Sequence, residues 1–128
     1  MTTLRFEGKV FTGEGNGKKY LALPWVKRQI EEKAGFSPFL GTLNLKLDGE
    51  SVRRRKMLET MNAKEVNPKK GYCLGLLFKA QVGEVEGAIV LPQVKGYPAD
   101  VLEIVAPVNL RETLKIGDGD IISVAVQG

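Results

Sequence analysis

A chain of 128 residues that is 43% hydrophobic is long enough to bury one core, and we expect a single domain spanning residues 1–128. Its formal charge of +4 favours an anionic partner. The absence of histidine excludes a Ser/His/Asp triad, a Cys/His pair and an imidazole-bound zinc ion. Any chemistry must therefore use carboxylates, lysine, backbone amides or a metal ion held through oxygen.

The single cysteine and the overall hydropathy bear on the cellular compartment. Cys73 excludes an internal disulfide and lies in an apolar run, which predicts a small core residue. No stretch approaches the ~20 apolar residues of a membrane span, and the first residues lack the apolar centre of a signal peptide. We expect a cytoplasmic protein that has no membrane partner.

Short runs of alternating or β-branched residues, separated by glycine, proline and charged turns, predict strands along most of the chain. These strands are expected at residues 4–11, 19–23, 42–47, 72–83, 86–91, 101–106 and 120–126. Their spacing is too short for repeated strand–helix–strand units, so the expected fold class is mainly β, a small and largely antiparallel closed barrel. Glu103, which alternates with Leu102 and Ile104, is expected to face solvent.

Two segments between the strands have helical patterns. In residues 24–35, Pro24 lies in the first turn, apolar residues recur at spacings of four, and Gly35 stands where a left-handed residue ends a helix. We expect this helix to cover one end of the barrel. A shorter helix is expected at 52–61, and its basic run Arg53–Lys56 is typical of a solvated face, with a phosphate contact as the alternative.

The segment TGEGNGKKY, residues 12–20, has a glycine at every second position before two lysines. Alternate glycines permit positive φ and let an anion approach the backbone, so that successive N–H groups can form a cradle for phosphate. The spacing matches neither the Walker loop nor the dinucleotide-binding fingerprint. A flexible hairpin loop and a phosphate cradle both remain open for this segment taken alone.

The segment GTLNLKLD, residues 41–48, places three leucines on one side of an extended chain and Thr42, Asn44 and Lys46 on the other. Residues two apart on a strand are separated by roughly 6.5 Å, so the oxygens of Thr42 and Asn44 can converge on one hard cation. Mg²⁺ is usually held by few protein ligands, with water and phosphates completing its shell. The same residues also fit the wet side of a half-buried strand that binds no metal.

These segments occur together with GFSPFLGTLN, EGAIVLP, APVNLRETL and IGDGDIISV, in that overall order. From Gly8 to Val126 the combination resembles the archaeal CTP-dependent riboflavin kinases. The resemblance implies a six-stranded cradle-loop barrel, related to the RIFT barrels, with one or two short helices. It also implies Mg²⁺-assisted transfer of the γ-phosphoryl group of CTP to the 5′-hydroxyl of riboflavin, giving FMN and CDP, and we expect a monomer.

The resemblance further implies roles for particular residues. Thr42 and Asn44 would bind Mg²⁺, and Glu112 of the L-R-E motif would contact the flavin and is the first candidate for a catalytic base. The segment around Tyr97 and Pro98 aligns poorly, so these two residues are taken as neighbours of a second flavin contact. The residues expected to bind the nucleotide are Glu14, Gly15, Asn16, Gly17, Lys18, Lys19, Ile116, Gly117, Asp118 and Gly119.

A non-enzymatic alternative comes from the basic character of the chain. Small β-barrels with a turn like IGDGD before the last strand include dimeric DNA-binding transcription factors, in which Arg53–Lys56 would meet phosphates. That alternative leaves the T-L-N motif and the glycine-rich segment unexplained, so nucleic acid is not the expected partner. Some members of the kinase family carry an N-terminal winged helix, for which 128 residues are expected to leave no room.

Overall fold

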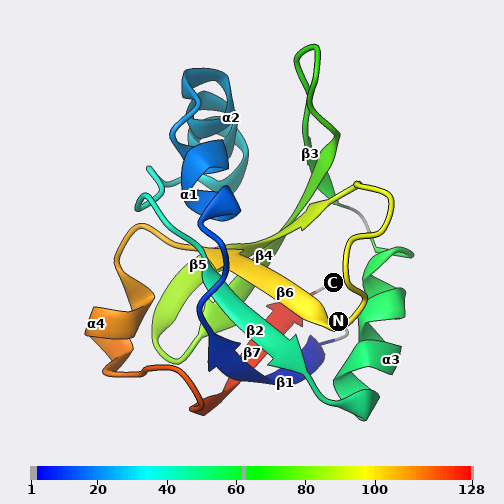
Figure 1. Cartoon of the computed structure of the whole chain (residues 1–128), viewed down its shortest axis with the longest axis vertical. Helices are drawn as coiled ribbons and strands as arrows, with labels where there is room; N and C mark the ends of the chain where they lie inside the picture. Colours follow the sequence, from blue (N-terminus) through cyan, green and yellow to red (C-terminus); the bar gives the residue numbers. More distant parts are fainter. Residues whose placement is uncertain (1–2, 62, 128) are drawn as a thin grey trace.

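The computed structural model describes residues 3–61 and 63–127, which form one strongly curved antiparallel sheet and four helices (Figure 1). The strands are β1 (Thr3–Phe11), β2 (Leu43–Leu47), β3 (Lys64–Val66), β4 (Gly75–Val82), β5 (Val85–Pro92), β6 (Val101–Val105) and β7 (Ile121–Gln127). The helices are α1 (Asn16–Leu21), α2 (Pro24–Ala34), α3 (Gly49–Leu58) and α4 (Leu110–Leu114). None of these helices is long and apolar enough to cross a membrane.

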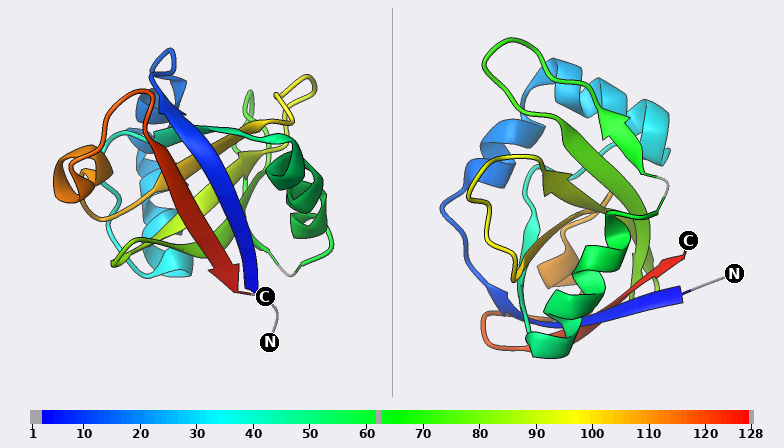
Figure 2. Two further views of the ribbon diagram at one scale, coloured as in Figure 1. Left: turned by 90° about the horizontal axis from the view of Figure 1, so that it is seen from below. Right: turned by 90° about the vertical axis from the view of Figure 1, so that its right-hand side faces the viewer.

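Six of the strands close into a barrel. The order around it is β4-β5-β6-β2-β1-β7, and β7 pairs with β4, for example at Ala80 and Val126, to complete the circle. β3 pairs only with the start of β4, and Figure 2 shows β1 and β7 side by side in both views. The expected six-stranded antiparallel barrel is confirmed, with four helices in the described residues where one or two were expected.

The barrel interior is filled by side chains that alternate along the strands. Leu43, Leu45 and Leu47 of β2 are buried there, together with Phe6 and Val10 of β1. Successive side chains of a strand point to opposite faces of the sheet. Burial of the three leucines therefore leaves the polar residues between them on the outer face of the barrel wall.

A second buried cluster lies outside the wall. β5 is buried on both faces, because Ile89 belongs to the interior cluster whereas Ala88 and Val90 belong to the outer one. Val26 and Ile30 of α2 are fully buried in the same outer cluster. The predicted helix is therefore confirmed, but it covers the outer face of the wall and not an end of the barrel.

Two further expectations about the fold are wrong. Residues 19–23 do not form a strand but end α1 and begin the turn after it, since five residues of alternating pattern fit either period and the helix buries Leu21 in the outer cluster. Cys73, expected in the core, is exposed. The reason is that β4 begins only at Gly75, so the apolar run before that residue is loop.

α3 begins about one turn before the expected span of 52–61. The Asp48 carboxylate accepts the backbone N–H of Ser51 at 2.8 Å, which caps the first turn. The Ser51 hydroxyl in turn accepts the backbone N–H of Glu7 in β1 at 2.9 Å. The cap therefore both starts the helix and attaches it to the barrel.

Candidate active site

The glycine-rich segment leaves β1 and leads into α1. Gly15 forms the N-cap of α1 with φ +86°, a conformation that glycine adopts without steric cost. At Gly13 a Cβ would lie 2.4 Å from Asn44 Nδ2, and at Gly17 a Cβ would lie 2.4 Å from Thr42 Oγ1. The hairpin-loop alternative is wrong, because the segment joins a strand to a helix and lies directly against the polar face of β2.

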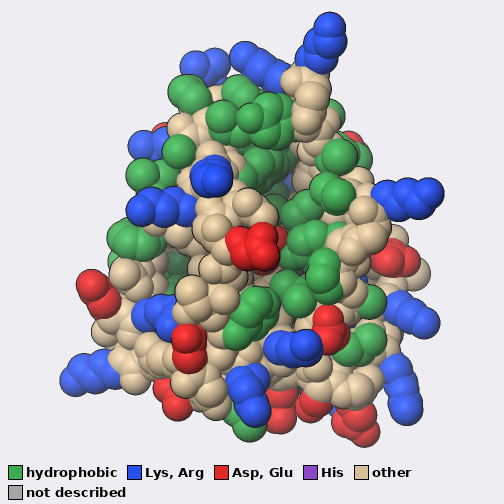
Figure 3. Space-filling model, viewed as in Figure 1, with side chains coloured by type: hydrophobic (Ala, Val, Ile, Leu, Met, Phe, Trp, Pro, Cys, Tyr) green, Lys and Arg blue, Asp and Glu red, His purple; other side chains and the backbone are tan. Residues whose placement is uncertain are grey.

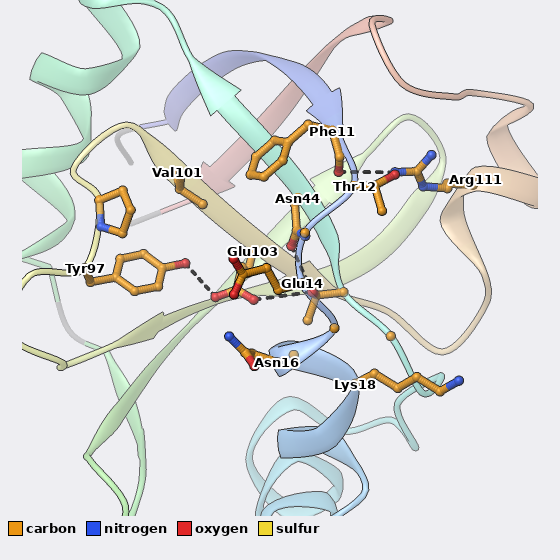
Figure 4. A pocket seen from close by; sticks show the side chains of 16 residues that line it. Phe11, Thr12, Glu14, Asn16, Lys18, Asn44, Tyr97, Val101, Glu103 and Arg111 are labelled. Atoms are coloured by element: carbon orange, nitrogen blue, oxygen red, sulfur yellow. Dashed lines mark hydrogen bonds between the residues drawn. The ribbon is translucent and has the colours of Figure 1, made fainter.

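Thr42 and Asn44 point together on the outer face of the wall. The Thr42 hydroxyl is 2.9 Å from Asn44 Oδ1 and 3.3 Å from Glu103 Oε1. Asn44 is paired with Glu103 across β2 and β6, so these side chains share one face (Figure 4). The expectation that Glu103 faces solvent is wrong: the alternation of β6 does turn it outward, but Gly17 lies close over it and leaves it half-buried.

The oxygens of Thr42 and Asn44 fit a small, hard cation. In an octahedron with metal–oxygen bonds of about 2.0–2.1 Å, neighbouring oxygens are about 2.9 Å apart. The hydroxyl and amide oxygens are 2.9 Å apart in this structure. The described residues contain no group of three or more His, Cys, Asp or Glu side chains that could hold an ion alone. An ion at this pair would keep positions for water and substrate oxygens, as Mg²⁺ usually does.

Tyr97 reaches Glu103 from the connection between β5 and β6. Its hydroxyl donates to Glu103 Oε2 at 2.5 Å (Figure 4). Burial raises the pKa of the Tyr97 phenol, and the adjacent Glu103 carboxylate raises it further, so the hydroxyl keeps its proton. The Arg55 guanidinium lies 5.7 Å from the centre of the Tyr97 ring, and its Nη1 donates to the Ala99 carbonyl at 3.2 Å. Arg55 therefore anchors the connection that carries Tyr97, and is not simply part of a solvated face.

Two cavities of ligand size meet at Glu103. The glycine-loop cavity, of about 640 Å³, lies between the segment 11–18, the outer face of β2 and Arg111. The apolar cavity, of about 490 Å³, is lined mostly by hydrophobic and aromatic side chains of α1, β5 and the segment 72–75. Figure 3 shows hydrophobic side chains gathered around a hollow beside α1 and α2, with Lys and Arg at its outer edge. The residues that line both cavities are Asn16, Gly17, Thr42, Tyr97 and Glu103.

Arg111 ties the end of β1 to the turn before β7. Its Nη2 donates to Asp118 Oδ1 at 2.8 Å, to the Phe11 carbonyl at 3.2 Å and to Thr12 Oγ1 at 3.3 Å. The Thr12 hydroxyl donates to the Asp118 carboxylate at 2.9 Å. Two segments that the resemblance assigns to nucleotide binding, the glycine-rich segment and this turn, are therefore fastened to each other.

This fastening predicts a difference in acid stability. The Arg111 guanidinium and the Thr12 hydroxyl hold the pKa of the Asp118 carboxyl below its usual value. The stability that the ionised Asp118 carboxylate contributes is therefore complete above the unfolded-state pKa of about 3.9. It is lost as the pH falls through the lower folded-state pKa. We expect the Tm of Asp118→Asn to fall less than the Tm of the wild type when the pH is lowered from about 5 to about 3. Thermal melts followed by circular dichroism measure both values. Equal losses in the two proteins would show that the ion pair contributes nothing.

The residues expected to bind the nucleotide lie in three places. Those that line the glycine-loop cavity are Glu14, Gly15, Asn16, Gly17 and Lys18. Lys19 lines the apolar cavity instead, and Figure 4 shows the Lys18 side chain pointing away from the cavity centre. Ile116, Gly117, Asp118 and Gly119 form the turn before β7 and line neither cavity, although Arg111 connects them to the glycine-loop cavity.

The residues expected near the flavin are also divided. Tyr97 and Pro98 line the glycine-loop cavity, and Tyr97 lines the apolar cavity as well. Glu112 is exposed on α4, where its backbone N–H is capped by Asn109 Oδ1, and it lines neither cavity. Its proposed contact with flavin remains a prediction.

Two residues at the centre of the site were not selected from the sequence. Glu103 could have been found only from the pairing of β2 with β6, which places it opposite Asn44. Arg111 lies inside the L-R-E motif, in which only the neighbouring Glu112 was assigned a role, as a flavin contact and candidate base. Its role follows from contacts with Thr12 and Asp118, which no local pattern indicates.

Comparison with known proteins identifies the family. Residues 10–126 match a family model named CTP-dep_RFKase and described as a domain of unknown function, DUF120. Proteins named riboflavin kinase from Pyrobaculum aerophilum, Archaeoglobus fulgidus and Methanosarcina barkeri are 41%, 36% and 38% identical over 98%, 97% and 97% of this chain. The chain spans 62%, 55% and 57% of the lengths of those three relatives. The resemblance found in the motifs is confirmed, and the chain belongs to the CTP-dependent riboflavin kinase family.

Proposed function

We propose that this chain transfers the γ-phosphoryl group of CTP to the 5′-hydroxyl of riboflavin, with Mg²⁺ as cofactor, and releases FMN and CDP. The observation that carries the proposal is the meeting of two ligand-sized cavities at Thr42 and Glu103, beside Asn44. Phosphoryl transfer needs a donor and an acceptor held in line at one charged centre. The names of the relatives support riboflavin as the acceptor, and the name of the family supports CTP as the donor.

The glycine-loop cavity is the proposed nucleotide site. Residues 13–17 bring backbone amides to its wall, and the glycines leave no side chain between those amides and a ligand. Lys18 adds positive charge at the edge of this cavity, although its side chain is turned away from the centre, whereas Lys19 lines the apolar cavity. Arg111, which also lines this cavity, would place the turn at 116–119 within reach of the nucleotide.

The apolar cavity is the proposed flavin site. The tricyclic ring of riboflavin is broad and largely apolar, and this cavity offers it Tyr72, Val90 and their hydrophobic neighbours. With the ring there, the ribityl chain would extend toward the wall shared by the two cavities. Glu103 is the carboxylate that lines both cavities, and it is therefore a better-placed hydrogen-bond acceptor for the 5′-hydroxyl than Glu112, which lines neither.

The chemistry requires positioning and charge neutralisation rather than a covalent enzyme intermediate. Thr42 and Asn44 would hold Mg²⁺, which when bound neutralises charge on the transferring group. The amides of residues 13–17 hold the phosphates still, and Glu103, braced by Tyr97, orients the acceptor hydroxyl toward the phosphorus. No histidine is needed for these roles.

The decisive experiment incubates the protein with riboflavin, Mg²⁺ and each of the four nucleoside triphosphates in turn, and detects FMN by chromatography. We expect FMN with CTP and little with the other three. No FMN with any of the four would refute the kinase proposal. Salt-sensitive binding of duplex DNA in the same preparation would favour the transcription-factor alternative, although Arg54 and Arg55 are already engaged by Glu50 and Ala99.

A further inference from the structure

The Thr42 hydroxyl has one proton and two acceptors within reach. Oδ1 of Asn44 lies at 2.9 Å and Oε1 of Glu103 at 3.3 Å. A hydroxyl donates a single hydrogen bond, and the shorter contact here points the proton at Asn44. That arrangement is incompatible with a cation shared by both oxygens, because the proton would occupy the space between them. When an ion binds, the proton must turn to another acceptor.

Glu103 is placed to be that acceptor. Strand pairing puts it opposite Asn44, and Oε1 is the second acceptor that the described residues offer to the Thr42 hydroxyl. Its other oxygen, Oε2, already accepts the short hydrogen bond from Tyr97. The carboxylate is therefore held at one oxygen and free to accept at the other, and Arg55 in turn holds the Tyr97 ring.

We propose that Glu103 is a positioning residue that accepts the Thr42 proton and so turns the lone pairs of Thr42 and Asn44 toward the metal ion, with Tyr97 fixing its orientation. The inference rests on the proposed function, and it gives Glu103 a role toward the metal besides its contact with substrate. Glu103 acts here through the hydroxyl and not as a ligand of the ion. Residues that orient metal ligands in this way typically account for about 10–100-fold in metal affinity.

The test measures Mn²⁺ binding in the presence of CDP, with free Mn²⁺ followed by electron paramagnetic resonance. Glu103→Ala should weaken binding by about 10–100-fold. Glu103→Gln should stay within about three-fold of the wild type, because its amide oxygen still accepts the Thr42 proton. Tyr97→Phe should lose about 3- to 10-fold, since one hydrogen bond to Glu103 is removed. Glu86→Ala, which removes an exposed carboxylate on β5, is the matched control and should bind like the wild type.

Several outcomes would overturn the inference. If Glu103→Gln binds Mn²⁺ as weakly as Glu103→Ala, the charge of the carboxylate matters and not its acceptor oxygen. Wild-type affinity in Glu103→Ala, with FMN still formed by the wild type, removes this inference and leaves the proposed function intact. Failure of the wild type to bind Mn²⁺ or to form FMN removes both. If Glu103→Ala does not fold, as judged by circular dichroism, wild-type affinity in Tyr97→Phe refutes the proposal.

Discussion

Replacing Asn44 with alanine is expected to lower kcat/KM for riboflavin phosphorylation by about 10²–10³-fold while the protein stays folded. The side chain contributes an oxygen 2.9 Å from the Thr42 hydroxyl. It contributes nothing to the interior of the barrel, because it lies between two buried leucines on the outer face of β2. The loss should be measured as FMN formation at saturating Mg²⁺ and CTP, with circular dichroism confirming the fold.

Lys46→Ala is the matched control for that variant. Lys46 is the next outward-facing residue of β2, but it is exposed, pairs with Asp100 at 3.6 Å and lines neither cavity of the site. An exposed ion pair contributes at most about 1 kcal/mol to stability, so the variant should stay folded. Because Lys46 lines neither cavity, its turnover should stay within about two-fold of the wild type. Wild-type turnover in Asn44→Ala would exclude Asn44 as a metal ligand. Equal losses in both variants would instead indicate damage to the strand.

The strands that matter for the site could be predicted because their signal is local. Alternation in GTLNLKLD decides which side chains share a face, and the buried leucines of β2 follow it without exception. The alternation of residues 42–47 is therefore enough to predict that Thr42 and Asn44 lie on one face. The same reasoning failed at 19–23, where a run of five residues is too short to distinguish a strand from the helix α1 that the outer cluster stabilises.

The partners of that pair could not be predicted, because they come from distant parts of the chain. Glu103 lies 61 residues from Thr42 and joins it only through the pairing of β2 with β6. Tyr97 belongs to a connection without a repeating pattern, and its place is set by contacts with Arg55 and Glu103. The glycines were ambiguous for the same reason: the atoms that exclude a Cβ at Gly17 belong to Thr42 and Glu103, which are distant from it in the sequence.

Gly17→Ala is expected to reduce kcat/KM by about 10²-fold, because a displacement of about 1 Å at a phosphoryl-transfer site can have an effect of that size. A Cβ at this position would lie 2.4 Å from Thr42 Oγ1 and 3.0 Å from Glu103 Oε1. Either α1 or the proposed metal ligands, Thr42 and Asn44, must therefore move. Helix propensity acts in the opposite direction, since alanine is favoured over glycine by about 1 kcal/mol within a helix. Turnover and the affinity for CDP with Mg²⁺, measured by calorimetry, should therefore fall far more than stability.

Two other glycines separate crowding from backbone effects. Gly49→Ala, in the first turn of α3, introduces a Cβ with nothing within 4 Å and should keep full turnover. Gly15→Ala also meets no protein atom within 4 Å, but its φ of +86° strains an alanine by about 1–2 kcal/mol, so its stability should fall through the backbone and not through a collision. Of these three variants, only Gly17→Ala combines a helical backbone with a collision at Thr42, one of the two proposed metal ligands. If it binds CDP and Mg²⁺ like Gly49→Ala, the close approach of the glycine-rich segment to Thr42 is not what builds the nucleotide site.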